Sequence, residues 1–118
     1  MNGAMSSPSK EQASRFLRSV DQEHSFLFYQ DVGEYTGASA KNLEEFLSRL
    51  QTIGVRSIQF HAGRGDFENW IVMLGDDWLS RQLKEAKRGL IGEELRKRLV
   101  ETVRTRNDFL KSRLTNTS

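Results

Sequence analysis

Apolar side chains recur at helical spacing within residues 57–79, and the other predicted elements are arranged around this segment. Phe67, Trp70, Ile71 and Leu74 follow an i, i+3, i+4, i+7 pattern, which places all four on one face of a helix. The segment also holds three of the nine glycines. We therefore predict a short helix, a glycine corner, a second short helix and the start of a third, with the aromatic side chains directed into a core.

Residues with capping chemistry stand at both ends of the second short helix. Asp66 precedes the apolar set, and an aspartate there accepts a hydrogen bond from a free amide of the first turn, a role worth about 1 kcal/mol. Gly75 follows the set, and glycine ends helices because it adopts the left-handed backbone without a Cβ penalty. Asp76 is then expected to cap the next helix.

The same spacing continues the third of these helices over about residues 76–88 and predicts three further helices, at about residues 9–21, 39–53 and 92–114. The clearest is 39–53, where four large apolar side chains share one face and Gly54 follows. In the longest, 92–114, the apolar side is marked by Leu95, Leu99, Val103, Leu110 and Leu114.

Two segments have an ambiguous pattern. Residues 25–29 form a short aromatic run, which periodicity alone does not divide between a strand and a buried helix. A loop-like stretch rich in glycine and polar residues follows at 31–38. Ser57 is expected to cap a short helix through about residue 62, although the imperfect alternation of 55–61 leaves a strand as the other interpretation.

These elements predict an all-α fold, a compact bundle of about five to six helices with short, glycine-punctuated connections. The alternative is an α+β fold with a small sheet formed by residues 26–30 and 56–61. A chain of 118 residues has the size of one domain. We expect a disordered segment at 1–8, a single helical domain at 9–114 and a frayed tail at 115–118.

Composition excludes several kinds of site. The chain has no cysteine, which removes disulfides, thiolate zinc sites and cysteine nucleophiles. No apolar run approaches the length of about 18 residues that a membrane span needs. We expect a soluble cytoplasmic protein without a membrane partner.

Charge is distributed unevenly along the chain. Residues 1–80 hold 7 Lys and Arg against 11 Asp and Glu, a net charge of −4, while residues 81–118 hold 11 against 5, a net charge of +6. A basic segment of this kind can contact phosphate backbones or an acidic partner. The other interpretation is that it packs on the acidic part of its own chain or stays solvated. Candidate nucleic-acid contacts are Lys84, Lys87, Arg88, Arg96, Lys97, Arg98, Arg104 and Arg106.

Several short motifs, taken in order, resemble a small prokaryotic family, prominent in archaea, that is defined only as a domain of unknown function. They are Gly33-Glu-Tyr-Thr-Gly37, Leu43-Glu-Glu-Phe46, Ser57-Ile-Gln-Phe-His61, Asp66-Phe-x-x-Trp70, Leu74-Gly-Asp76, Gly92-Glu-Glu-Leu-Arg96 and Arg106. The resemblance covers about residues 25–112 and leaves 1–24 outside. It implies a mostly helical domain and supplies no activity, cofactor or substrate.

One cluster has the residue types of a reactive or binding site. His61 with a nearby carboxylate, Asp66, can act as a base, and Arg64 can hold an anion. Trp70 adds an aromatic surface for a ligand or partner. The structural interpretation is favoured: Asp66 caps a helix, Arg64 bonds Asp66 or a carbonyl, His61 is half-buried and Trp70 belongs to the core. We predict no catalytic residue, no metal site and no cofactor, because phosphate-loop and calcium-loop spacings are absent from the sequence.

Three functions from different classes follow from these features. The first, which we favour, is a non-catalytic interaction module that binds a protein partner or a second copy of itself. The second is nucleic-acid binding through the basic C-terminal third. The third is a small-molecule or enzymatic site around His61.

Overall fold

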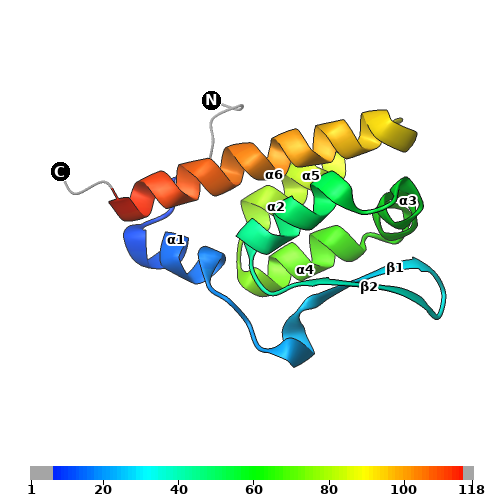
Figure 1. Ribbon diagram of the computed structural model, residues 1–118. Coiled ribbons are helices and arrows are strands. Elements are labelled where there is room, and N and C mark those ends of the chain that lie inside the picture. Colours follow the sequence, from blue (N-terminus) through cyan, green and yellow to red (C-terminus); the bar gives the residue numbers. More distant parts are fainter. Residues whose placement is uncertain (1–6, 116–118) are drawn as a thin grey trace.

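The computed structural model describes residues 7–115, which form six α-helices, a short 3₁₀ helix and one β-hairpin (Figure 1). The N-terminal half contains α1 (Lys10–Leu17), η1 (Gln22–His24), β1 (Phe26–Asp31), β2 (Glu34–Ala40) and α2 (Leu43–Thr52). The C-terminal half contains α3 (Val55–Arg64), α4 (Asp66–Leu74), α5 (Asp77–Ala86) and α6 (Gly92–Thr115).

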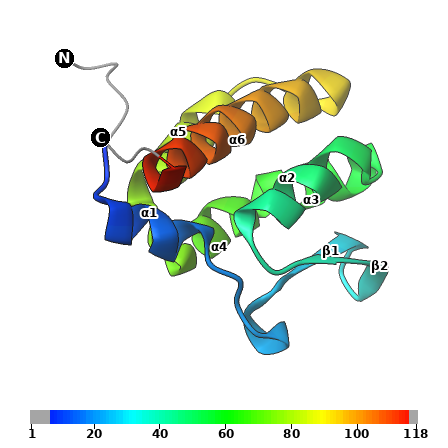
Figure 2. The ribbon, with the colours of Figure 1, turned by 60° about the vertical axis from the view of Figure 1, so that its left-hand side comes forward.

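The long helix α6 organises the helical layer. It runs along one side of the molecule and packs against α1, α2, α3 and α5 (Figures 1 and 2). Helix α1 lies beside the C-terminal part of α6, where the Pro8 carbonyl accepts a hydrogen bond from Arg113 Nε at 3.2 Å. Helices α3 and α4 meet at a corner, and α3 also packs against β1. The hairpin closes the remaining side of the core.

The hairpin is a two-stranded antiparallel sheet that is only partly covered. Phe26 pairs with Ala40 and Phe28 with Ala38, and these positions face the core. A two-residue turn joins Asp31 to Glu34, and Gly33 takes a φ of 74°, a left-handed value that glycine adopts without strain. Every residue from 30 to 37 is exposed. The tip therefore projects beyond the helical layer, as Figure 1 shows.

The core beneath the hairpin is dominated by aromatic rings. Phe26 lies within 4.7–5.9 Å, centroid to centroid, of Phe28, Phe46, Phe67 and Trp70. These rings come from β1, α2 and α4, so one cluster joins three parts of the chain. Tilted and edge-on ring pairs add about 0.5–1.5 kcal/mol each beyond area burial. This cluster fixes the hairpin against the helices.

The expectation of a mostly helical fold is confirmed, with a small sheet of the kind that the alternative contained. One strand of that sheet is where the alternative placed it, at residues 26–31. Its partner is 34–40, while residues 56–61 lie in α3, so the helical interpretation of that segment is correct. In the described part of the chain, no helix is both long and apolar enough to span a membrane.

Some predicted boundaries are wrong for tertiary reasons. The first helix ends at Leu17 rather than near residue 21, because Arg18 is extended and its Nη1 donates to the Leu74 carbonyl at 2.8 Å. Val20 then donates its backbone N–H to the Lys41 carbonyl at 2.8 Å. Helix α2 begins after its cap, Asn42, because residues 39 and 40 belong to β2. Of the predicted disordered segment at 1–8 and the predicted frayed tail at 115–118, residues 1–6 and 116–118 lie outside the described residues.

Gly63 is expected to limit the stability of α3. It lies inside the helix, outside the left-handed region, and a Cβ built on it meets nothing within 4 Å. Because glycine in a helix interior costs about 0.5–1 kcal/mol relative to alanine, Gly63→Ala should raise the free energy of unfolding by that amount. Urea denaturation measures the change. A loss of stability would show that the glycine is required by the fold.

Candidate functional site

The α3–α4 corner brings together His61, Arg64 and Asp66. Gly65 turns the chain between the helices with a φ of 76°. Asp66 Oδ2 then accepts hydrogen bonds from His61 Nδ1 at 2.8 Å and from Arg64 Nε at 3.0 Å. Asp66 makes no capping hydrogen bond, so its predicted role as a helix cap is wrong. The Asp66 carboxylate instead accepts hydrogen bonds from the two basic side chains.

His61 is held in one neutral form by its hydrogen bonds. Its Nε2 accepts the backbone N–H of Tyr29 at 2.8 Å and therefore has no hydrogen of its own. The remaining ring hydrogen lies on Nδ1 and is donated to Asp66. Burial lowers the pKa of His61, and the carboxylate of Asp66 opposes this only in part. The side chain is 5% exposed, against the half-burial that the sequence suggested.

Ser57 completes the attachment of the hairpin to α3. Its Oγ donates to the Tyr29 carbonyl at 2.6 Å, one helical turn before His61. Ser57 is therefore an interior residue of α3, and its predicted role as the helix cap is wrong, because Gly54 occupies the N-cap position. Together Ser57 and His61 bind both backbone polar groups of Tyr29, at a point where the β1–β2 register is interrupted. These paired backbone bonds give His61 a structural role.

Trp70 belongs to the core. Its ring contacts those of Phe26 and Phe46, and its side chain is largely buried, with the whole residue 8% exposed. The indole Nε1 donates to the His24 carbonyl at 2.8 Å, which satisfies its polar atom. Trp70 thus anchors η1 to α4, and only its small exposed part lines an open pocket of about 430 Å³, which Asp66 also lines.

A shallow pocket of about 280 Å³ lies beside the cluster, between the hairpin turn and α3. Arg64 and Asp66 line it together with Tyr29 and Val32, whereas His61 does not. The Arg64 guanidinium, half exposed, lies 5.0 Å from the centroid of the Phe60 ring. The predicted cluster is therefore assembled, but its histidine is screened from the pocket.

The neutral state of His61 predicts a pH dependence of stability. Because the folded pKa lies below the ordinary value of 6.5, the unfolded chain takes up a proton that the folded chain resists as pH falls below about 6.5. The stability that neutral His61 contributes is fully present above about pH 6.5 and is lost as the pH falls toward the pKa of His61 in the folded chain. The free energy of unfolding should therefore decrease between pH 7 and pH 5. Urea denaturation of the wild type and of His61→Phe at several pH values measures this dependence, and the free energy of unfolding should decrease less steeply in the variant. Equal slopes of the free energy of unfolding against pH would contradict the neutral state assigned to His61.

Arg106 is not available to nucleic acid. It is completely buried, and its Nε and Nη2 donate to the two carboxylate oxygens of Asp76 at 2.8 and 2.9 Å. Its guanidinium also lies 4.6 Å from the Trp78 ring centroid. Asp76 caps α5 as predicted, accepting from the Leu79 N–H at 3.1 Å. The sequence held a signal for this pair, because Arg106 falls on the apolar stripe of the last helix.

Two more of the predicted basic contacts are engaged within the fold. Lys87 Nζ lies 2.7 Å from Glu68 Oε2 and 2.7 Å from the Ala62 carbonyl. Arg96 donates to the Leu50 carbonyl at 2.8 Å and pairs with Glu93 at 2.6 Å. The basic segment thus packs partly on the acidic part of its own chain, as one of the two interpretations stated. The exposed members of the set are Lys84, Arg88, Lys97, Arg98 and Arg104.

Exposed charges along one face of α6 alternate in sign. Acidic and basic side chains follow one another at intervals of three or four residues along one face, all of them exposed: Glu94, Lys97, Glu101, Arg104, Asp108 and Lys111. This arrangement is typical of a solvated helix face stabilised by ion pairs. It provides no continuous positive stripe for a phosphate backbone.

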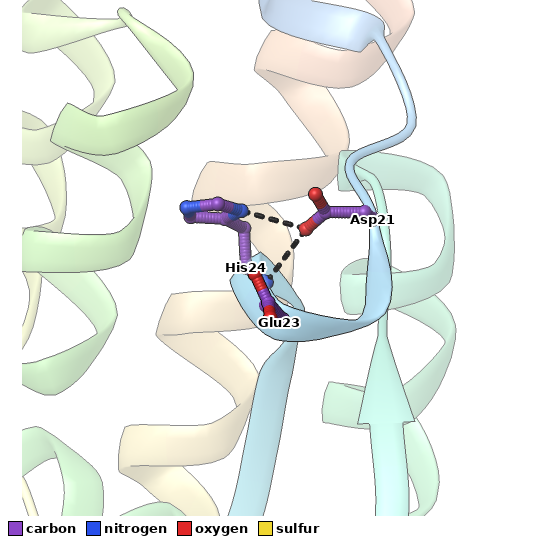
Figure 3. A group of neighbouring side chains, drawn as sticks. All are labelled: Asp21, Glu23 and His24. Atoms are coloured by element: carbon purple, nitrogen blue, oxygen red, sulfur yellow. Dashed lines mark hydrogen bonds and ion pairs between the residues drawn. The ribbon is translucent and has the colours of Figure 1, made fainter.

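A group of potential metal ligands lies on η1. Among residues 7–115, Asp21, Glu23 and His24 form the one group of three whose ligand atoms all lie within 4.8 Å of one another (Figure 3). All three are exposed. Asp21 Oδ1 accepts from both the backbone N–H and Nδ1 of His24, at 3.1 and 2.6 Å, and these bonds lower the Asp21 pKa. Capping of η1 accounts for this geometry.

Comparison with known proteins identifies a family. A family model described as a family of unknown function, DUF5752, matches residues 5–104. The chain belongs to the DUF5752 family. The match begins earlier than the resemblance at 25–112, so α1 and η1 are part of the DUF5752 domain. No curated protein and no solved structure matches the chain.

Proposed function

We propose that this DUF5752 protein is a non-catalytic interaction module that binds protein surfaces through the tip of its β-hairpin. The observation that carries the proposal is the projecting segment 30–37, which is exposed along its whole length (Figure 1). Among the described residues five large hydrophobic side chains are exposed, and three of them lie on the hairpin: Leu27, Val32 and Tyr35. Exposed apolar side chains gathered on one element are typical of binding surfaces.

The state of His61 favours binding over catalysis. A general base needs a free lone pair near a reacting group, but the lone pair of His61 accepts the Tyr29 N–H. Its other nitrogen is bonded to Asp66, and no part of the ring lines the neighbouring pocket. A small-molecule or enzymatic site at His61 therefore has less support.

Nucleic-acid binding also has less support, because the exposed α6 face alternates in charge and Arg106 is buried. A mobility-shift titration with double-stranded DNA and with RNA at low salt tests it. We expect no shift. Binding through phosphate contacts would instead show an affinity that falls linearly with the logarithm of the salt concentration, because counterion release imposes this dependence.

A cytoplasmic location remains a prediction.

Site-specific photocrosslinking tests the interaction proposal. A photoreactive phenylalanine replaces Tyr35, which is 48% exposed on the hairpin, and in a control replaces Arg104 on the exposed face of α6. Irradiation of native cells should give a discrete adduct at position 35 and none at position 104. The same background at both positions would contradict the proposal. Mass spectrometry of the adduct identifies the partner.

A further inference from the structure

A second exposed apolar feature lies on the other side of α3 from the hairpin turn. It is a groove of about 400 Å³ between α3 and the α5–α6 corner. Ala62, Leu90 and Leu95 line it, and Ile91, 77% exposed, lies at its margin. Gly63 also lines the groove, and the absence of a Cβ at this position leaves it open.

The charges of the groove and the hairpin tip are opposite. Both charged residues that line the groove are basic. Lys87 is engaged by Glu68 and the Ala62 carbonyl, whereas the Arg88 side chain is 73% exposed and pairs with Glu85 only at the surface, at 3.6 Å, so Arg88 is the cation that the groove offers. At the tip, Val32 is 77% exposed and lies between Asp31 and Glu34. These acids pair with Arg56 at 3.3 and 3.8 Å, but all three side chains are at least half exposed, so the pairs contribute little and are readily exchanged. An acidic tip with an apolar apex complements a basic groove with an apolar floor.

The tip and the groove lie at the same end of the molecule. The pocket beside the tip contains Phe60 and Arg64 of α3, and the groove contains Ala62 and Gly63 of the same helical turns. Two copies that meet through this end can therefore exchange contacts in both directions. Such an exchange is isologous and closes after two subunits. Contact of groove with groove would instead bring like charges together.

We propose that the chain forms a two-fold homodimer in which the hairpin tip of each copy, with Val32 at its apex, occupies the groove of the other. This inference rests on the proposed interaction function and specifies its partner as a second copy. Asp31 and Glu34 then face Arg88 of the opposite copy. The interaction uses two tip–groove contacts per dimer.

Sedimentation equilibrium of the purified full chain tests the dimer, with one variant for each half of the contact. Val32→Asn removes the apolar apex and suits a turn, whereas Gly63→Leu fills the groove with a good helix former where a Cβ meets nothing. Each substitution acts twice per dimer. Since a buried valine contributes about tenfold or more in affinity, Val32→Asn should weaken dimerisation about a hundredfold. Circular dichroism melts should show both variants folded.

Mixing the two variants gives the sharper measurement. A heterodimer of Val32→Asn with Gly63→Leu retains one intact tip–groove contact, so it should form more tightly than either variant homodimer. A monomeric wild type, a dimer unaffected by the two substitutions, or the absence of preferential heterodimers would each overturn the proposal. If wild type is monomeric while the position-35 adduct contains a different protein, the homodimer fails and the interaction function stands. Absence of any adduct would reject the interaction function separately.

Discussion

Replacing Arg106 with alanine is expected to lower the free energy of unfolding by about 3–5 kcal/mol, the usual result of removing one partner from a buried ion pair. Arg106 is fully buried and bonds both carboxylate oxygens of Asp76, whose side chain is 3% exposed. Alanine would leave the Asp76 carboxylate buried without its counter-charge, and it would also remove the packing of the guanidinium on Trp78. Urea denaturation monitored by tryptophan fluorescence measures the loss.

Arg104 provides the matched control for this substitution. It lies two residues away on the same helix and is exposed, so Arg104→Ala should change stability by no more than about 0.5 kcal/mol. Asp76→Asn keeps a side-chain oxygen able to cap α5 but removes the charge. The double variant Asp76→Asn, Arg106→Met should recover much of the single-variant loss. Equal effects at positions 104 and 106 would show that the buried pair has no special importance.

Replacing His61 with alanine is the second large effect, expected at about 2–4 kcal/mol. The change leaves the Tyr29 N–H without its acceptor. It also removes a ring that lies within 4.8–5.6 Å of the Phe26 and Phe67 ring centroids, which opens a cavity in the aromatic core. The same urea denaturation measures this loss.

His24 is the corresponding control, because it is the chain's other histidine and is exposed. Its substitution by alanine should cost less than about 1 kcal/mol. Hydrogen exchange adds a local measurement: the Tyr29 amide should be protected in wild type and exchange much faster in His61→Ala. An unchanged Tyr29 amide would contradict the role assigned to His61.

The helices could be predicted where apolar residues repeat at a regular interval. In α2 and α4 the spacing of leucine and aromatic residues determines which face is buried, and Gly75 ends α4 with a φ of 112° as expected. The second strand, 34–40, could not be predicted in the same way. Its sequence of small and polar residues does not alternate, and its conformation depends on pairing with β1, which is a long-range contact.

The sequence predicts which residues form the candidate site but not which hydrogen bonds join them. His61, Arg64 and Asp66 are close in sequence, and the structure joins them through one oxygen of Asp66. Asp66 had two uses compatible with the sequence, capping or ion pairing, and only the turn at Gly65 decides between them. Tyr29 was not included, because it lies 32 residues before His61 in the chain. The charge of Arg106 favours a surface position, whereas its place on the apolar stripe of the last helix indicates the core, where the structure places it.

The two side chains that hold Tyr29 have a consequence for polymerisation. A strand at the margin of a sheet presents free amides and carbonyls on which another chain can align, and this is a common route to fibrous aggregates. At Tyr29 the outward amide and carbonyl of β1 are already taken by His61 and Ser57. Helix α3 thus takes the place of a third strand there and prevents stacking of further chains along that margin.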